Sequence, residues 1–432
     1  MRKPTQRYSD IQARQLQKIQ SLVTYASQNV PYYRKLFQQP GMQILPLRSL
    51  YDFEMLPLVE KPTIQQNWHA FLSDQFAEKE LVIRFTSGST GQPLKCAHSV
   101  AERLVLGRHM MRARMQWGVT FPARWLILGG AVRFASGLLQ KHEQTMKGGE
   151  DFLMLSTLEL SPAIAAEYVQ KIQQFQPQWV YGMPTALAQI AAYAQQQDLQ
   201  LHIPGLRLIE TVGELLHDNQ RQLIQSLFQV PPANQYASRE VWGIGFECPH
   251  GQMHLLTENT YVEILRLDGQ PAAIGEKGEV VVTGLNNRAQ PFIRYRLGDI
   301  GVIYDEPCPC GNPNPSIRLT GGRVSEKIWG MEDRVGTLVF DSVVRAMCQR
   351  GLDNILQYRV VQRTANRFEA QVVPKGEWTN AHQEFFVHQT RKLLREETEV
   401  QIVLVDSIPP LPSGKAKSFL VDLAQEPLAT YE

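Results

Sequence analysis

Short apolar runs alternate with amphipathic stretches through the middle of the chain, from about residue 80 to residue 300. Buried strands are predicted for the apolar runs at 125–128, 179–181, 206–212 and 278–283. Residues 161–172 and 184–194 carry apolar positions at helical spacing, and Ser161 followed by Pro162 is a favourable N-cap and first-turn pair. Strands that alternate with helices predict an α/β fold with crossover connections.

The two ends of the chain have other patterns. The opening hundred residues read as helices followed by short loops, with prolines at the boundaries. Near residue 321 the chain turns through Gly321, Gly322 and Arg323, and strand-like segments follow at 358–361, 368–373 and 400–405, with two helices between them. This pattern predicts a compact α+β tail domain, and we expect the domains to be 1–322 and 323–432.

Composition narrows the class of protein. The 432 residues are 43% hydrophobic and 20% charged, with a formal net charge of +2, so no basic or acidic surface indicates nucleic acid or membrane as a partner. The first thirty residues are polar and helical in character, unlike a secretion signal, and no apolar stretch is long enough to span a membrane. We expect a cytoplasmic protein.

A loop of small residues directly follows the apolar run at 81–85. It consists of Thr86, Ser87, Gly88, Ser89, Thr90 and Gly91. Glycines let successive backbone N–H groups converge on a phosphate, and the hydroxyls add donors without bulk. The segment does not match the P-loop pattern of nucleoside triphosphatases. Taken alone, the segment could be a flexible surface turn, as loops of this composition usually are.

Four further motifs follow in order, at 213–214, 235–240, 293–299 and 411–417. Each has an ordinary explanation in isolation: Glu240 as a solvated acid, Asp299 as a turn residue, Lys415 as an exposed lysine. As an ordered set with the 86–91 loop, they resemble the motifs of the adenylate-forming superfamily. Within it, they are most similar to the phenylacetate–coenzyme A ligase group and its coenzyme F-adenylating and capsule-biosynthesis relatives. The resemblance runs nearly end to end and includes the segments 30–34 and 56–61.

The resemblance implies a fold and a reaction. The fold is a large domain of mixed sheets flanked by helices, followed by a small mobile C-terminal domain. In the reaction, a carboxylate attacks the α-phosphate of ATP, forming an acyl-adenylate and releasing pyrophosphate. Such catalysis consists mainly of positioning the reactants and neutralising phosphate charge.

It also implies roles for residues of the nucleotide site. The 86–91 loop covers the β- and γ-phosphates, with Thr86 also catalytic, and Lys95 adds a nearby cation. Tyr236 stacks on adenine, and Glu240 holds Mg²⁺. Asp299 accepts hydrogen bonds from the ribose hydroxyls. The remaining implied nucleotide-binding residues are Gly213, Glu214, Ala237, Ser238 and Arg296.

Lys415 matches the tail-domain lysine that reaches into the site and stabilises the transferring α-phosphate. The chain departs from the family pattern at three places. Ala237 stands where the family usually has glycine, Val324-Ser325-Glu326 replaces the usual hinge aspartate, and the segment 327–334 diverges. The hinge and the following segment serve the thioester-forming half-reaction, which is therefore the half with less support from the sequence.

Three of the five cysteines form a separate pattern. Cys248, His254, Cys308 and Cys310 supply three thiolates and an imidazole, a complete tetrahedral set for a structural Zn²⁺. Relatives in the resembling group have a similar arrangement. His250 is a competing ligand. The other interpretation, buried hydrophobic cysteines, is the one we adopt for Cys96 and Cys348.

The function expected from the resemblance is ATP- and Mg²⁺-dependent adenylation of a carboxylic acid, inclined toward an aryl or arylacetic acid. A thiol, either coenzyme A or a carrier protein, could then receive the acyl group. Two alternatives stay open: AMP transfer to a hydroxyl, as in the coenzyme F-adenylating relatives, and a degenerate member that binds nucleotide without turnover. A homodimer is a further open expectation.

Overall fold

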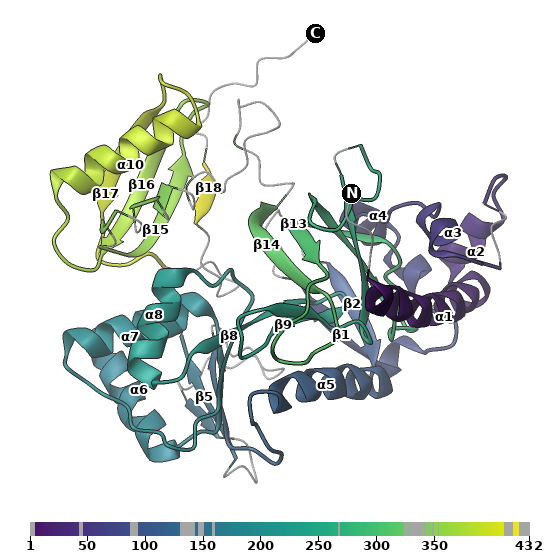
Figure 1. Cartoon of the computed structure of the whole chain (residues 1–432), viewed down its shortest axis with the longest axis horizontal. Coiled ribbons are helices and arrows are strands. Elements are labelled where there is room, and N and C mark those ends of the chain that lie inside the picture. Colours follow the sequence, from purple (N-terminus) through teal and green to yellow (C-terminus); the bar gives the residue numbers. More distant parts are fainter. Residues whose placement is uncertain are drawn as a thin grey trace. The chain divides into compact units, whose positions relative to one another are not determined.

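The computed structural model describes residues 5–42, 46–86, 94–129, 143–145, 151–157, 160–266, 268–323, 328, 340, 343–344, 346–347, 350–352, 354–409 and 418–422. The chain forms two compact units, each assembled from two separate segments (Figure 1). Unit 1 is Met1–Val119 with Ala233–Gly321, and unit 2 is Thr120–Pro232 with Gly322–Glu432. The domains expected from the sequence, 1–322 and 323–432, stay a prediction.

Unit 1 begins with helices, as the sequence predicts. The apolar residues of α1 (Gln6–Asn29) recur at helical spacing, and Ile11, Ile19, Leu22 and Ala26 are buried. The remaining helical segments of the unit are α2 (Pro31–Phe37), α3 (Leu50–Glu54), α4 (Lys61–Gln66), the 3₁₀ turns η1 (Trp68–Phe71) and η2 (Glu78–Glu80), and α5 (Val100–Met115). A capping box formed by Ser99 and Glu102 starts α5.

Two sets of strands complete unit 1. A hairpin of β1 (Leu81–Phe85) and β2 (Lys95–Ser99) is antiparallel. The larger set, in spatial order, is β11 (Thr260–Leu265), β12 (Lys277–Gly284), β13 (Tyr295–Tyr304), β14 (Ser316–Arg323), β10 (Met253–Leu255), β9 (Trp242–Glu247) and β8 (Pro232–Ser238). Side chains of α1 to α4 pack with this set in one apolar core that includes Leu22, Phe53 and Val282.

Unit 2 contains the predicted crossover fold. Its five strands in spatial order are β7 (Leu208–Val212), β6 (Trp179–Gly182), β3 (Trp125–Gly129), β5 (Phe152–Ser156) and β4 (Glu143–Thr145). The pairs β3–β5, β3–β6 and β6–β7 are parallel, and β4–β5 is antiparallel. The helices are α6 (Pro162–Phe175), α7 (Pro184–Gln196) and α8 (Asp218–Phe228). Ser161 caps α6 with Pro162 in its first turn, which confirms the predicted start.

The tail segment of unit 2 forms a four-stranded sheet. Its strands in spatial order are β17 (Glu399–Leu404), β16 (Arg367–Pro374), β15 (Ile355–Gln362) and β18 (Phe419–Val421). One of the two predicted helices, α10 (Asn380–Leu393), lies between β16 and β17. The other helical residues described, at 340, 343–344 and 346–347, precede β15, so the placement of two helices between the strands is wrong. Within the described part of the chain, no helix has the length and apolar character to cross a membrane.

Candidate active site and metal centre

The turn between β8 and β9 places Glu240 in a buried position. Ser238 Oγ accepts a hydrogen bond from the Val241 N–H at 3.3 Å, which closes the turn. Trp242 follows with a φ of 65°, a left-handed conformation that is costly for a bulky side chain. Glu240 is only 7% exposed, and its Oε1 accepts the Tyr295 hydroxyl at 3.1 Å. The turn buries the Glu240 carboxylate, and a neutral hydroxyl from β13 holds one of its oxygens. This arrangement is compatible with a metal ligand.

Tyr236 and Asp299 are in direct contact. The Tyr236 hydroxyl donates to Asp299 Oδ2 at 2.8 Å, although the two residues are 63 positions apart. A bulge in β13 makes this contact possible: β12 advances from Glu279 to Val281 while β13 passes from Ile300 to Arg296. Gly298, within the bulge, has a φ of 80°. The structure thus brings together the two residues assigned to the nucleoside.

Thr86, the first residue of the glycine- and hydroxyl-rich loop, is hydrogen-bonded to Leu94 on the other side of the loop. Its N–H donates to the Leu94 carbonyl at 3.0 Å, and its Oγ1 accepts the Leu94 N–H at 2.9 Å. The hydroxyl therefore keeps its own proton available to donate to a ligand. Lys95 follows Leu94 in the chain, and its ammonium lies 4.9 Å from the centroid of the Trp68 ring. The loop residues Ser87, Gly88, Ser89, Thr90 and Gly91 lie outside the described residues, as does Lys415.

Arg296 binds carboxylates of the protein. Its guanidinium donates to Glu279, with Nη2 2.6 Å from Oε2, and to Glu60 Oε1 at 3.0 Å. The hydrogen bonds to Glu279 are the largest contribution that raises the pKa of Arg296. The Arg296 guanidinium is therefore already neutralised, and its expected support of Asp299 stays a prediction.

In unit 2, Gly213 and Glu214 follow β7. Gly213 has a φ of 84°, which explains a glycine there. Glu214 Oε2 accepts the Thr185 N–H at 3.1 Å and the Thr185 hydroxyl at 2.7 Å, so the carboxylate satisfies a free donor in the first turn of α7. Glu214 has a clear structural role, and its expected nucleotide contact stays a prediction.

Cys248, His254, Cys308 and Cys310 converge in unit 1. One atom from each, three Sγ atoms and a ring nitrogen, lies within 4.8 Å of every other. Cys248 Sγ is 3.7 Å from Cys308 Sγ. Two thiolates bound at about 2.3 Å to one tetrahedral zinc would lie about 3.8 Å apart. The spacing of the thiols therefore fits a zinc ion.

The ionisation of the cluster also suits a metal. The His254 Nδ1–H donates to the Asn314 carbonyl at 2.8 Å, which leaves Nε2 directed at Cys310 Sγ, 3.2 Å away. Burial lowers the pKa of His254 and so favours the neutral imidazole that binds metals. Burial raises the pKa of Cys248 to about 12, so a thiolate there needs a compensating cation. His250, the competing ligand, is exposed and is not part of this group.

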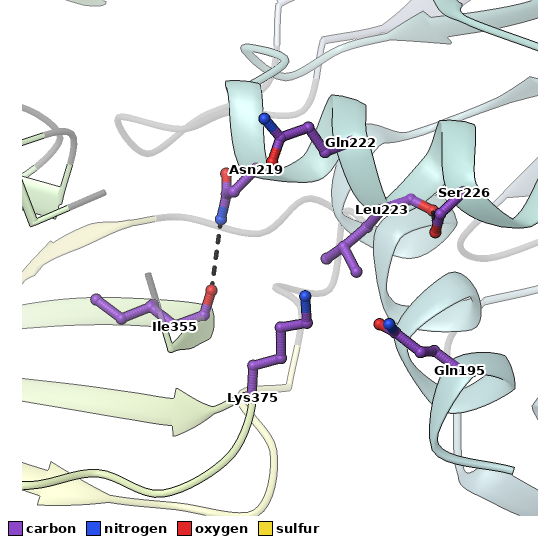
Figure 2. Close-up of a pocket in the computed structure, with 7 residues that line it drawn as sticks. All are labelled: Gln195, Asn219, Gln222, Leu223, Ser226, Ile355 and Lys375. Atoms are coloured by element: carbon purple, nitrogen blue, oxygen red, sulfur yellow. Dashed lines mark hydrogen bonds between the residues drawn. The ribbon is translucent and has the colours of Figure 1, made fainter. Parts of the chain in front are cut away.

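A small pocket lies elsewhere, in unit 2 (Figure 2). It is lined mainly by polar side chains of α7, α8 and the tail segment: Gln195, Asn219, Gln222, Leu223, Ser226, Ile355 and Lys375. Its volume of ≈ 160 Å³ is below the range of about 300–1,000 Å³ typical of ligand sites. Asn219 Nδ2 donates across it to the Ile355 carbonyl at 3.4 Å. None of the predicted site residues lines it.

The sequence analysis missed the donor to Glu240 and a buried ion pair that lies next to it in the chain. Tyr295 lies within the 293–299 motif, and it is the donor to Glu240. Arg294, its neighbour, forms a buried ion pair with Glu263, with Nη2 2.8 Å from Oε1. Burial raises the pKa of Glu263, and the Arg294 charge opposes that rise. Nothing in the sequence around Arg294 indicates this partner, because Glu263 lies on β11, 31 residues earlier in the chain.

Comparisons with known proteins identify the family. A model of the AMP-binding enzyme family matches residues 42–288, more than half of the chain. Phenylacetate-coenzyme A ligase of Thermus thermophilus is 23% identical over 323 residues, covering 74% of this chain and 71% of that protein. Protein CapK of Staphylococcus aureus is 22% identical over 425 residues, covering 95% of this chain and 89% of that protein.

Solved structures show the same fold. A 2-hydroxyisobutyryl-CoA ligase, crystallised in a postadenylation state with an acyl-AMP, has a TM-score of 0.75 at 20% identity and covers 97% of this chain and 91% of its own. An amide bond synthetase from Marinactinospora thermotolerans has a TM-score of 0.53 at 19% identity, covering 79% and 68%. The α/β prediction and the resemblance are confirmed. The chain belongs to the AMP-binding enzyme family and is an ATP-dependent adenylate-forming ligase similar to the phenylacetate-coenzyme A ligases.

Proposed function

We propose that this ligase uses ATP and Mg²⁺ to adenylate a small aryl or arylacetic acid and then transfers the acyl group to coenzyme A. The family supports the adenylating half, and the relatives named phenylacetate-coenzyme A ligase support the acid and the acceptor. The observation that carries the proposal is the 2.8 Å contact of Tyr236 with Asp299. It joins the residues that the resemblance assigns to adenine and to ribose.

Each end of the nucleotide has residues suited to it. Tyr236 offers an aromatic face to adenine, and Asp299 offers acceptors to the ribose hydroxyls. Glu240 would hold Mg²⁺, since its carboxylate supplies the oxygen ligands that this ion prefers. When bound, the ion would neutralise charge on the phosphates. Thr86 would donate its hydroxyl proton to the β- and γ-phosphates, and Lys415 would neutralise the α-phosphate during transfer.

A structural zinc ion is the second part of the proposal. Cys248, His254, Cys308 and Cys310 would hold it with no coordination position left open. The 3.7 Å separation of Cys248 and Cys308 supports this assignment. Metal analysis of the purified protein should find one zinc per chain, and an unmodified protein that binds no zinc would contradict it.

The test of the reaction combines two measurements on one panel of carboxylic acids. ATP–pyrophosphate exchange reports adenylation, and mass spectrometry of the products with and without coenzyme A reports the acceptor. We expect exchange with at least one aryl acid, and an acyl-coenzyme A product. In Lys415→Ala, exchange should fall by about a hundredfold or more, while ATP binding changes little.

Other outcomes would support the alternatives. A stable adenylylated hydroxyl compound, formed without a thiol, would replace the proposal by AMP transfer. Exchange without thioester formation, restored by an added carrier protein, would replace only the acceptor. No ATP–pyrophosphate exchange with any acid of a broad panel would indicate nucleotide binding without turnover.

A further inference from the structure

Arg84 lies on the strand that leads into the 86–91 loop. It pairs directly with Cys96 across the β1–β2 hairpin, so both side chains lie on one face of the hairpin. Thr86, two residues on, is hydrogen-bonded to Leu94 as the next step of the same ladder. Residues two apart in an extended chain point to the same side. Arg84 and the base of the predicted phosphate loop therefore share a face.

The β8–β9 turn brings a second arginine to this face. Arg239 directly precedes Glu240 and is exposed, whereas Glu240 is buried. Burial is the main cause that raises the pKa of the Cys96 thiol, the Glu240 charge raises it further, and the Arg239 charge opposes the rise. Both charges of the turn therefore act on the hairpin face that carries Arg84.

A third arginine comes from α5. The Arg103 guanidinium lies over the Trp242 ring, with Cζ 5.3 Å from the ring centroid, and Trp242 begins β9 just after the turn. Burial is the main cause that lowers the pKa of Arg103, and the charges of Arg84 and Arg239 lower it further. Three elements thus bring three like charges together.

Protein carboxylates do not neutralise this cluster. Among the residues that the structure describes, Arg84, Arg103 and Arg239 form no ion pair, and Arg103 Nε is buried without a hydrogen-bond partner. Glu102, next to Arg103 in the chain, is already used: Oε2 accepts the Ser99 N–H at 2.7 Å, and Oε1 accepts the Arg288 N–H at 2.6 Å. Glu240, next to Arg239, accepts the Tyr295 hydroxyl and is the carboxylate proposed for Mg²⁺. Grouped cations without a counter-charge are unfavourable unless an anion binds.

A second unsatisfied polar atom lies at the same aromatic ring. His98, 2% exposed, has its ring centroid 5.9 Å from that of Trp242. Its Nε2 has no hydrogen-bond partner within the described part of the chain. The backbone of Glu240 hydrogen-bonds the His98 ring and raises its pKa.

We propose that Arg84, Arg103 and Arg239 form an oxyanion site that binds the β- and γ-phosphates of ATP and the pyrophosphate released from them. The inference rests on the proposed function for the identity of its ligand. Pyrophosphate matches the site in charge, and guanidinium groups bind phosphate oxygens through paired N–H donors. Arg84 is two residues from Thr86 and Arg239 adjoins Glu240, so the arginines would lie where negative charge accumulates as the α–β phosphate bond breaks.

The test measures pyrophosphate binding directly, by titration calorimetry with magnesium pyrophosphate on the full chain. Arg103→Gln and Arg239→Gln should each weaken binding by tenfold or more, and Arg103→Lys, which keeps the charge, should weaken it less. Arg112→Gln is the matched control, because Arg112 is an exposed arginine of the same helix. It should bind within twofold of the unmodified protein. Equal unfolding temperatures would show that the variants are folded.

Exchange kinetics separate this inference from the proposed function. If the site holds the phosphates, both Gln variants should raise KM for ATP and for pyrophosphate and leave KM for the acid unchanged. A rise confined to KM for the acid would assign the oxyanion to the carboxylic substrate and overturn the inference. Unchanged pyrophosphate affinity in both Gln variants would also overturn it. Lost pyrophosphate affinity in a protein that shows no exchange would support the site while the proposed reaction fails.

Discussion

Strand β9 (Trp242–Glu247) joins two polar clusters that are held in different ways. Beside its first four residues lie two hydroxyl–carboxylate hydrogen bonds: Tyr295 donates to Glu240 at 3.1 Å, and Tyr236, which pairs with Gly245, donates to Asp299 at 2.8 Å. At its end, Cys248 enters a group of three thiols and an imidazole. Hydroxyl–carboxylate bonds can be exchanged for bonds to a ligand, whereas a tetrahedral metal site fixes its loops permanently.

The difference implies separable roles. The cluster at the start of β9 should control chemistry with little effect on folding, and the cluster at its end should control folding with little direct effect on chemistry. Variants at the two ends of one strand test whether that separation holds.

Glu240→Gln should have the largest effect on activity. The amide keeps an acceptor for the Tyr295 hydroxyl but loses the charge that would bind Mg²⁺ in the proposed function. We expect ATP–pyrophosphate exchange to fall by about a thousandfold, equivalent to about 4 kcal/mol, with the free energy of unfolding changed by less than about 1 kcal/mol. If the free energy of unfolding fell by as many kcal/mol as the activation barrier rose, Glu240 would have a structural role instead.

Cys310→Ser should show the opposite pattern. Removal of one thiolate from the group leaves an incomplete ligand set, so zinc content should fall and the free energy of unfolding should drop by about 3 kcal/mol. At a temperature where the variant is folded, exchange should stay within about threefold, since the ligands contact no reacting atom. Denaturant unfolding, metal analysis and exchange measured on one preparation decide between the outcomes. Cys96→Ser, a buried cysteine outside the group, is the control for metal content.

His98→Gln should remove an acid-sensitive contribution to stability. Burial, aided by the Arg103 charge, lowers the pKa of His98 from 6.5 to about 4. As pH falls, the unfolded chain takes up this proton first, so about 3 kcal/mol of stability is lost between pH 6.5 and pH 4. The free energy of unfolding of His98→Gln should therefore fall less than that of the unmodified protein between pH 6.5 and pH 4. Denaturant unfolding at several pH values measures this difference. If the stabilities of the unmodified protein and of His98→Gln fall by the same amount, the prediction is wrong.

Tyr295→Phe should have the smallest effect. It removes one hydrogen bond from Glu240, worth about 1 kcal/mol, and frees the carboxylate to rotate. We expect KM for MgATP to rise about fivefold, with kcat changed less. The comparison between Tyr295→Phe and Glu240→Gln shows how much of the effect at this cluster is orientation and how much is charge.

The sequence predicts local features better than contacts between strands. The alternation of strands and helices in 125–212 is found in β3, β6, β7, α6 and α7, because periodicity and capping act within short segments. The four metal-ligand candidates converge as expected, because cysteine and histidine have few other reasons to cluster.

The Tyr295–Glu240 bond and the arginine cluster were not predictable in the same way. Tyr295 reaches Glu240, and Asp299 reaches Tyr236, only through the irregular register of β13, which no spacing in the sequence signals. Arg84, Arg103 and Arg239 come from a strand, a helix and a turn, so their proximity depends on tertiary packing. The placement of the second tail helix failed for the same reason: periodicity predicts a helix without giving its neighbours.

The most direct test of the central claim measures ATP–pyrophosphate exchange for the unmodified protein, Glu240→Gln and Cys310→Ser together, at one temperature where all three are folded. We expect acid-dependent exchange in the unmodified protein, near-complete loss in Glu240→Gln, and near-normal exchange in Cys310→Ser. Exchange that survives in Glu240→Gln, or that disappears equally in both variants, would contradict it.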